Sequence, residues 1–170
     1  MQYMVQPPAW FFPRILVGAG AMLTADFARH YEITHVINCA FPDDSPRWFQ
    51  TFNRPKYVCL QAEDLPNVNI LDWYPKFELM LSIFLRDRGS KTVFIHCQCG
   101  INRSAFLALT YIVKNFHLNY DETFRALKRQ RPCMFSNTVF RKQTEEFVNG
   151  RLQSQKSSGT GDERIVDGNA

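Results

Sequence analysis

One cysteine in this sequence is followed by residues that together suit the binding of an anion. The segment consists of His96, Cys97, Gln98, Cys99, Gly100, Ile101, Asn102, Arg103 and Ser104. A cysteine thiolate is a nucleophile, and an arginine offers a planar fork of donors that matches two phosphate oxygens. Gly100 gives the loop between Cys97 and Arg103 the backbone freedom of a tight turn. These residue types at this spacing predict covalent chemistry at a phosphate group.

The elements on either side of this segment predict how it is placed. Thr92 to His96 is an apolar run that suits a strand buried on both faces, and Asn102 to Phe116 is a helical stretch that is apolar nearly all round. In a strand–loop–helix turn, backbone N–H groups converge on one point, where the positive end of the helix dipole also acts. We expect this field to favour the thiolate form of Cys97.

Strand-like and helix-like patterns alternate along the whole chain. The expected strands are Arg14 to Val17, Thr34 to Cys39, Lys56 to Leu60 and Thr92 to His96. The expected helices are Leu23 to Tyr31, Pro75 to Arg88, Asn102 to Phe116, Tyr120 to Gln130 and Asn137 to Leu152, with candidate caps at Thr24, Asp72, Asn119 (paired with Glu122) and Ser136 or Asn137. This alternation predicts an α/β domain with a mostly parallel central sheet flanked by helices.

The composition is typical of one soluble domain followed by a polar tail. A length of 170 residues, with 45% hydrophobic and 21% charged residues, fits a single domain over residues 1–152. Residues 153–170 are rich in Ser and Gly, and we expect them to be disordered. The sequence has no apolar run long enough for a membrane span and no signal-peptide pattern, so we expect a cytoplasmic protein without a membrane partner, a nuclear location being the alternative. The net charge of +4 is too small to indicate nucleic acid, and the oligomeric state stays open.

The segment around Cys97 resembles the Cys-x5-Arg-Ser/Thr signature of the protein tyrosine phosphatase superfamily, in its His-Cys-x-x-Gly-x-x-Arg-Ser form. Flanking runs resemble the dual-specificity branch: Ile-Thr-His-Val-Ile-Asn at 33–38, Thr-Tyr-Ile-Val at 110–113, and Arg131-Pro132 followed by Asn137, Phe140 and Gln143. Ser136 stands where that branch usually has proline, a departure that we expect to affect a helix start rather than the chemistry. The resemblance covers residues 14–148 and implies a small, stand-alone catalytic domain with the cysteine-dependent phosphatase fold and no cofactor.

The resemblance also implies roles for the residues of the signature. Cys97 attacks phosphorus and forms a phosphocysteine intermediate, while Arg103 binds the phosphate and stabilises the transition state. Ser104 donates a hydrogen bond to the sulfur and so eases its departure. His96 orders the loop by hydrogen bonding and helps to make Cys97 acidic. The residues that bind phosphate mainly through their backbone N–H groups are Gln98, Cys99, Gly100, Ile101 and Asn102.

A general acid must also protonate the leaving oxygen. In the family this acid is an aspartate on a loop about thirty residues before the cysteine, and Asp64 lies 33 positions before Cys97. We assign the role to Asp64, although most exposed loop carboxylates are simply solvated. Asp72 is the second candidate, better explained as a helix cap, and Glu63 is the third.

The other cysteines are assigned to packing rather than to metal or redox chemistry. Cys39, Cys59 and Cys133 are expected in the core, because cysteine is among the most buried residue types. Cys99 invites a redox role toward Cys97, but residues this close in a tight loop rarely meet disulfide geometry. No second ligand pair appears at the spacing of a structural zinc site, so we expect no metal.

The leading hypothesis is the hydrolysis of phosphotyrosine and phosphoserine or phosphothreonine in a phosphorylated protein substrate. One alternative is an RNA 5′-triphosphatase or another non-protein phosphatase, because residues 100–103 resemble the loop of RNA triphosphatases. Those enzymes commonly continue Thr-Gly where this chain has Ser104-Ala105. A catalytically dead phosphate-binding module is disfavoured, since the cysteine, the arginine and the acid are all present. A basic run, Arg125, Lys128, Arg129 and Arg131, is interpreted as a solvated face, with docking of acidic partners as the alternative.

Overall fold

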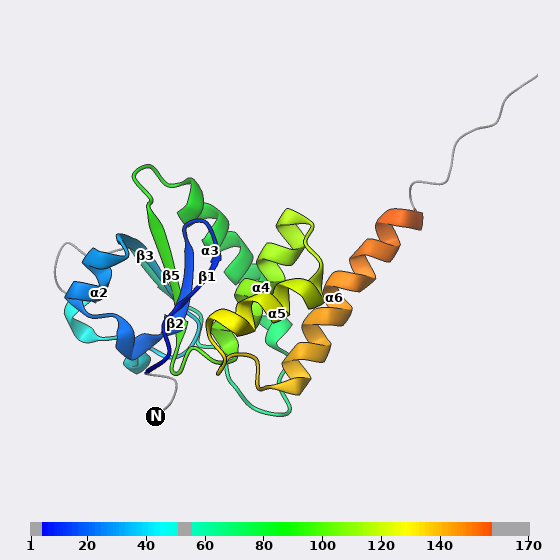
Figure 1. Ribbon diagram of the computed structural model, residues 1–170, viewed down its shortest axis with the longest axis horizontal. Helices are drawn as coiled ribbons and strands as arrows, with labels where there is room; N and C mark the ends of the chain where they lie inside the picture. Colours follow the sequence, from blue (N-terminus) through cyan, green and yellow to red (C-terminus); the bar gives the residue numbers. More distant parts are fainter. Residues whose placement is uncertain (1–4, 51–55, 158–170) are drawn as a thin grey trace, which may run out of the picture.

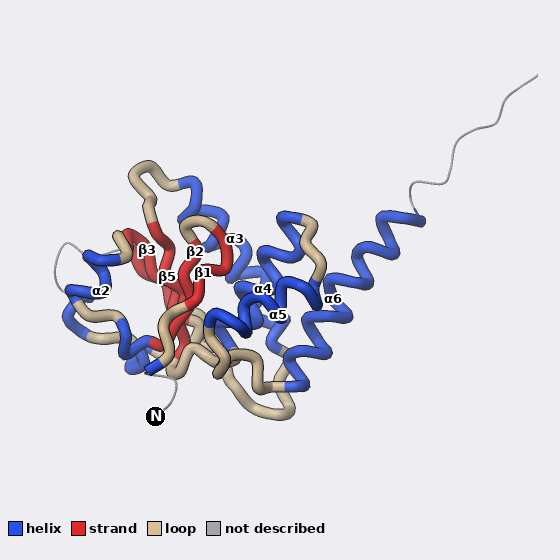
Figure 2. The backbone as a smooth tube through the Cα atoms, viewed as in Figure 1, coloured by secondary structure: helices blue, strands red, loops and turns tan. Residues whose placement is uncertain are grey.

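The computed structural model describes residues 5–50 and 56–157, which form a five-stranded sheet with helices on both faces (Figures 1 and 2). The strands are β1 (Ala9–Phe12), β2 (Ile15–Ala19), β3 (Ile33–Asn38), β4 (Lys56–Cys59) and β5 (Thr92–Cys97). Their order is β1-β2-β5-β3-β4, and every neighbouring pair is parallel except the antiparallel pair of β1 and β2. The predicted α/β domain with a mostly parallel sheet is confirmed.

The helices lie within a few residues of their predicted positions. They are α2 (Ala25–His30), α3 (Tyr74–Arg86), α4 (Arg103–Phe116), α5 (Tyr120–Gln130) and α6 (Thr138–Ser157). Three of the predicted caps are confirmed, because the side chains of Thr24, Asn119 and Asn137 each accept hydrogen bonds from backbone N–H groups in the first turn that follows. Asp72 does not cap α3. It ends a short 3₁₀ turn, and α3 begins at Tyr74 without a side-chain cap.

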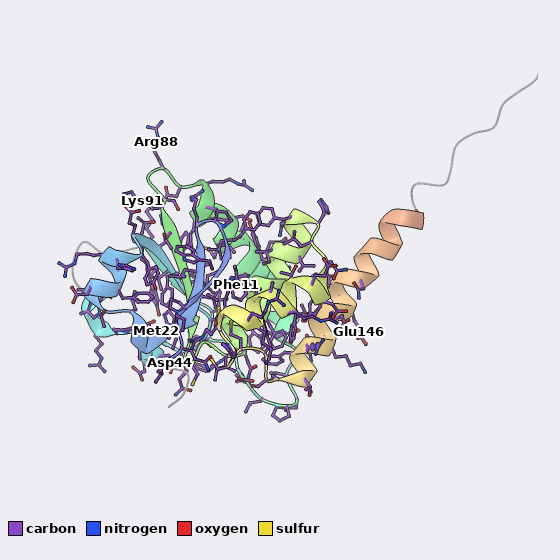
Figure 3. All side chains as sticks on the ribbon, viewed as in Figure 1. Phe11, Met22, Asp44, Arg88, Lys91 and Glu146 are labelled. Atoms are coloured by element: carbon purple, nitrogen blue, oxygen red, sulfur yellow. The ribbon has the colours of Figure 1, made fainter. Side chains whose placement is uncertain are left out.

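Strand β5 is the centre of the sheet, and all of its residues are buried. Successive side chains of a strand point to opposite faces, so β5 contributes to two cores. Val93, Ile95 and Cys97 belong to the larger core, which α3, α4, α5 and α6 cover, while Phe94 belongs to the smaller core beneath α2. Side chains such as that of Phe11 fill the space between sheet and helices (Figure 3).

Helix α4 lies in the middle of the larger core. Every residue of it from Arg103 to Val113 is buried, which explains why the sequence there is apolar nearly all round. The helix packs against the sheet on one side and against α3, α5 and α6 on the other. This central position fixes the N-terminus of α4 against the end of β5.

One strand and the end of one helix differ most from the predictions. Strand β1 was not predicted, because its region is interrupted by prolines, yet it pairs with β2, and the side chain of Gln130 bonds both the N–H and the C=O of Trp10. Helix α6 continues past Leu152 to Ser157. The rest of the predicted tail, residues 158–170, lies outside the described residues. Among the described helices, none is both long enough and apolar enough to cross a membrane.

Candidate active site

The turn between β5 and α4 places the predicted loop at the carboxyl end of the central strand. The loop begins after Cys97, and α4 begins at Arg103. Gly100 has a φ of +62°, and a Cβ added there would lie 2.3 Å from the carbonyl carbon of Gly18. Only glycine fits this position, because any side chain would overlap the backbone of the neighbouring β2 strand.

Cys97 and Ser104 meet at the base of this loop. The Ser104 hydroxyl donates a hydrogen bond to the Cys97 sulfur at 3.3 Å, and both residues are buried. A donor at this distance stabilises negative charge on the sulfur, and the N-terminus of α4 adds its positive dipole end. Both features lie at the one sulfur that ends β5.

Arg103 reaches from the first turn of α4 toward the loop that carries Asp64. Its Nη1 donates to the carbonyl oxygen of Ala62 at 3.0 Å, which orients the guanidinium. Its Nε is buried and has no hydrogen-bond partner among the described residues. An unpaired buried donor costs free energy unless a ligand satisfies it, so this nitrogen indicates an anion-binding position.

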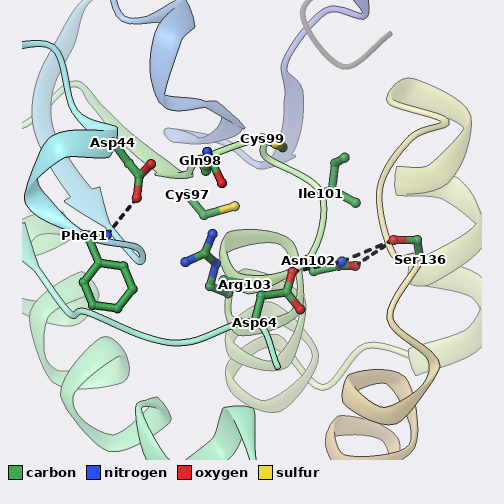
Figure 4. Close-up of a pocket in the computed structure, with 10 residues that line it drawn as sticks. All are labelled: Phe41, Asp44, Asp64, Cys97, Gln98, Cys99, Ile101, Asn102, Arg103 and Ser136. Atoms are coloured by element: carbon green, nitrogen blue, oxygen red, sulfur yellow. Dashed lines mark hydrogen bonds between the residues drawn. The ribbon is translucent and has the colours of Figure 1, made fainter. Parts of the chain in front are cut away.

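A hollow of about 440 Å³ opens above these side chains (Figure 4). Its lining residues are Phe41, Asp44, Asp64, Cys97, Gln98, Cys99, Ile101, Asn102, Arg103 and Ser136. The structure therefore brings together most of the predicted site. His96 and Ser104 lie beneath the hollow, in contact with Cys97.

Asp64 lies at the rim of the hollow and is held by two amide groups. Asn137 Nδ2 donates to its Oδ1 at 2.9 Å, and Asn102 Nδ2 donates to its Oδ2 at 3.2 Å. The competing candidates Asp72 and Glu63 are exposed and do not line the hollow. Of the three carboxylates considered from the sequence, Asp64 is the one placed near the sulfur and the guanidinium.

Helix α6 fixes the loop that follows Asp64. The Gln143 side chain accepts a hydrogen bond from the Ile70 N–H at 3.1 Å and donates to the Val68 carbonyl at 3.1 Å. Asn137, which bonds Asp64, also caps the first turn of α6. The C-terminal helix thus positions the candidate acid, although it contributes no side chain to the sheet end itself.

Arg131 clamps the anion-binding loop from behind. It is fully buried, its Nε donates to the Gly100 carbonyl at 3.1 Å, and its Nη2 donates to the Cys99 carbonyl at 2.9 Å. Its Nη1 reaches the carbonyls of Gln6 and Pro7. The interpretation of Arg131 as part of a solvated or docking face was therefore wrong: its side chain is buried and donates to two carbonyl oxygens of the loop.

We expect Arg131→Met to destabilise the protein, because it leaves buried carbonyl oxygens without donors. The free energy of unfolding should fall by about 3–5 kcal/mol, measured by urea denaturation. Arg129→Met is the matched control, since Arg129 is exposed in the last turn of α5, two residues before Arg131. An equal and small effect of both changes would contradict the role of Arg131.

His96 is fully buried beneath Cys97 and is neutral. Its Nδ1 lies 3.0 Å from the Cys97 carbonyl oxygen, which can only accept, so Nδ1 carries the proton and Nε2 accepts from the Ser45 hydroxyl at 2.8 Å. Burial lowers the pKa of His96 to about 4. Its two hydrogen bonds link the Cys97 backbone to the Ser45 side chain, and the neutral ring supplies no positive charge at neutral pH.

The buried neutral His96 predicts a loss of stability on acidification. Its pKa is about 4 in the folded protein and 6.5 in an unfolded chain, so between these values the unfolded state binds more protons. The free energy of unfolding should therefore fall by up to about 3 kcal/mol as the pH drops through this window. His96→Asn should show a shallower fall between pH 6.5 and pH 4 in parallel urea titrations. Parallel curves for the two proteins would contradict this prediction.

Four residues of the hollow were missed or only partly interpreted from the sequence. Phe41 and Asp44 follow β3, whose carboxyl end is beside that of β5, and this rule of parallel sheets could have found them. Ser136 was expected to affect only a helix start, but it lines the hollow and exchanges hydrogen bonds with the Asn102 side chain. Asn102, which was predicted to act mainly through its backbone N–H, also makes hydrogen bonds through its side chain.

None of the five cysteines forms a disulfide. Cys39 is buried as predicted, while Cys59 and Cys133 are half-buried. Burial raises the pKa of Cys39 well above its ordinary value, so this thiol stays protonated. Across residues 5–50 and 56–157, no three His, Cys, Asp or Glu side chains gather as a metal site would require.

Comparison with known proteins gives a consistent result. A family model described as the dual specificity phosphatase catalytic domain matches residues 15–149. A probable dual specificity protein phosphatase of Dictyostelium discoideum is 26% identical over 136 residues, which are 80% of this chain and 33% of that protein. Dual specificity protein phosphatase 22-B of Danio rerio is 33% identical over 98 residues, which are 57% of this chain and 52% of that protein. The chain thus spans between about a third and about half of these two relatives.

Solved structures share the fold over nearly their whole length. The human tyrosine phosphatase-like serine/threonine/tyrosine-interacting protein matches with a TM-score of 0.72 and 23% identity, covering 85% of this chain and 97% of that one. The structure of DUSP15 matches with a TM-score of 0.69 and 22% identity, covering 92% and 98%. The predicted fold class is confirmed by this likeness.

Proposed function

Because the chain belongs to the dual specificity phosphatase family, we propose that it hydrolyses phosphate monoesters on proteins. The substrates are phosphotyrosine and phosphoserine or phosphothreonine in a phosphorylated protein, and the reaction passes through a phosphocysteine intermediate. The observation that carries this proposal is the hollow in which Cys97, Arg103 and Asp64 converge, with the buried Arg103 Nε unpaired.

The first step forms a bond between sulfur and phosphorus. The Cys97 thiolate attacks phosphorus and the phosphorus–oxygen bond to the substrate breaks, while Asp64 gives its proton to the leaving oxygen. Arg103 and the N–H groups of residues 98–102 bind the three equatorial oxygens of the phosphoryl group. These oxygens share the negative charge of the transition state. The intermediate carries the phosphoryl group on Cys97.

The second step returns the enzyme to its starting form. Asp64, now ionised, accepts a proton from water as that water attacks phosphorus, and the sulfur–phosphorus bond breaks to release inorganic phosphate. The leaving sulfur recovers its negative charge, which the Ser104 hydroxyl at 3.3 Å stabilises. No redox step or cofactor enters this balance.

The charges around the hollow support a single phosphate as the substrate group. Arg103 is the one cationic side chain among its lining residues, and Asp44 and Asp64 are carboxylates. A 5′-triphosphate or a highly phosphorylated head group carries several negative charges, and clusters of cations are needed to bind them. This lining therefore favours protein monoesters over triphosphorylated RNA.

The proposal is tested by pre-steady-state hydrolysis of an aryl phosphate, followed by a substrate comparison. We expect a burst of the phenol equal to the enzyme concentration, and hydrolysis of phosphopeptides but not of triphosphorylated RNA. Absence of any turnover would leave only a phosphate-binding module. Release of the terminal phosphate from RNA in preference to peptides would replace the proposed substrate class.

We expect Asp64→Asn to slow poor leaving groups far more than good ones. An alkyl oxygen must be protonated as it leaves, whereas an activated phenol leaves as the anion. The loss in kcat should be about 10²–10³-fold for a phosphothreonine peptide and below about tenfold for an activated aryl phosphate. Asp72→Asn is the matched control. Equal slowing of both substrates by Asp64→Asn would remove it from the acid role.

A further inference from the structure

A rigid wall, made of Phe41 and Asp44, borders the hollow on the side opposite Asn102 and Ser136 (Figure 4). Phe41 precedes the short 3₁₀ turn Pro42–Asp44, and Asp44 is the last residue of that turn. The Phe41 N–H donates to Asp44 Oδ2 at 3.1 Å, and the Asp44 N–H donates to the Phe41 carbonyl at 2.9 Å. Neither residue has a place in the two chemical steps. Their position therefore calls for another role at the same site.

The surrounding elements hold this wall in place. The Asn38 side chain donates to the Phe41 carbonyl at 2.7 Å, and the Ser45 hydroxyl bonds the buried His96 ring at 2.8 Å. Gly20 allows the Asp44 carbonyl to approach closely, because a Cβ there would lie 2.0 Å from that oxygen. The Asp44 carboxylate is thus fixed at the mouth of a site that binds a dianion.

A carboxylate in this position weakens the binding of every phosphate, but it also distinguishes between substrates of different charge. Negative charge beside a bound phosphate repels that phosphate. It also repels an acidic side chain that the substrate carries next to the phosphate. The same carboxylate attracts a cation carried next to the phosphate. An arrangement that disfavours one substrate and favours another is a specificity element.

We propose that Asp44 selects phosphorylated segments with a Lys or Arg adjacent to the phosphoresidue and disfavours segments with acidic neighbours. The proposal rests on the proposed phosphatase function and names its substrate class more narrowly. The overall charge of +4 would by itself favour acidic peptides, so a preference for basic neighbours has to come from local charge. The exposed ring of Phe41, beside Asp44, provides an apolar surface for the stem of that Lys or Arg.

The test uses three phosphotyrosine peptides that differ only in the residue next to the phosphotyrosine: Arg, Gln or Glu. The wild-type protein should hydrolyse them in that order, with about three- to fivefold steps in kcat/KM at low salt that shrink at high salt. In Asp44→Asn the order should collapse to within about twofold. The same variant should hydrolyse a small aryl phosphate faster than the wild type, because a repulsion is removed. The asparagine keeps an acceptor for the Phe41 N–H, so the turn is preserved.

Asp43→Asn is the matched control, because Asp43 is exposed on the same turn and does not line the hollow. It should keep the wild-type order. If Asp44→Asn does not fold, the wild-type series at low and high salt still tests whether basic neighbours are preferred. An order with Glu first, no discrimination at low salt, or an unchanged order in Asp44→Asn would overturn the proposal. Hydrolysis of the aryl phosphate in the same assay separates these outcomes from a failure of the phosphatase function itself.

Discussion

Cys97→Ser should reduce turnover of every phosphate monoester by at least about 10⁴-fold while phosphate binding is retained. The serine hydroxyl is protonated at neutral pH, and no residue that lines the hollow is a histidine or lysine able to take its proton. Arg103 and the loop N–H groups are unchanged by the substitution, so the binding contribution remains. The measurements are steady-state kinetics with an aryl phosphate and competition binding of a phosphopeptide.

Cys59→Ser is the control for this experiment. The Cys59 thiol donates to the Ala40 carbonyl at 3.1 Å, a bond that a serine hydroxyl also makes, and the residue does not line the hollow. It should keep nearly wild-type activity. Substantial turnover by Cys97→Ser would mean that another group is the nucleophile.

Arg103→Lys should lower kcat/KM by about 10³-fold, although the charge is kept. A lysine ammonium cannot present two parallel donors to phosphate, and it cannot reproduce both the unpaired Nε and the bond from Nη1 to the Ala62 carbonyl. We expect kcat to fall and KM to rise, because the guanidinium contacts the phosphate in the substrate and contacts it more strongly in the transition state.

Arg125→Lys is the matched control, since Arg125 is exposed on α5. Urea denaturation of Arg103→Lys separates a catalytic loss from unfolding, because the lost bond to Ala62 also costs stability. A loss in kcat/KM below about tenfold, with the fold intact, would assign phosphate binding to the backbone alone.

Most of the fold could be predicted from the pattern of apolar and polar residues within each segment of the sequence. Strand β5 and helix α4 lie on either side of the nucleophile, and both are buried on every side. Their sequences are therefore apolar throughout, and this pattern predicted a buried strand and a buried helix. Strand β1 was missed because its pairing depends on β2 and on the distant Gln130 side chain. No periodicity within residues 9–12 encodes such a contact.

The residues of the site also differ in how far they could be predicted from the sequence. Cys97, Arg103 and Ser104 lie within one turn of chain, so spacing alone brings them together. Asp44 and Ser136 reach the hollow through tertiary structure, from the end of β3 and from the loop before α6. Arg131 was interpreted as exposed because it belongs to a basic run. It is fully buried, and carbonyl oxygens of the loop accept its hydrogen bonds. Burial of a charge depends on partners that sequence neighbours do not reveal.

The role of Cys97 as the nucleophile is tested most directly by measuring which residue carries the covalent intermediate and how many phosphoryl groups each chain carries. Asp64→Ala should be mixed with an activated aryl phosphate and quenched in denaturant within the burst, since loss of the base slows hydrolysis of the intermediate. Intact-mass and peptide-mass measurements should find one phosphoryl group per chain, on Cys97. A phosphoryl group on another residue, or a burst of phenol with none on the protein, would contradict the claim that the sulfur at the end of β5 attacks phosphorus.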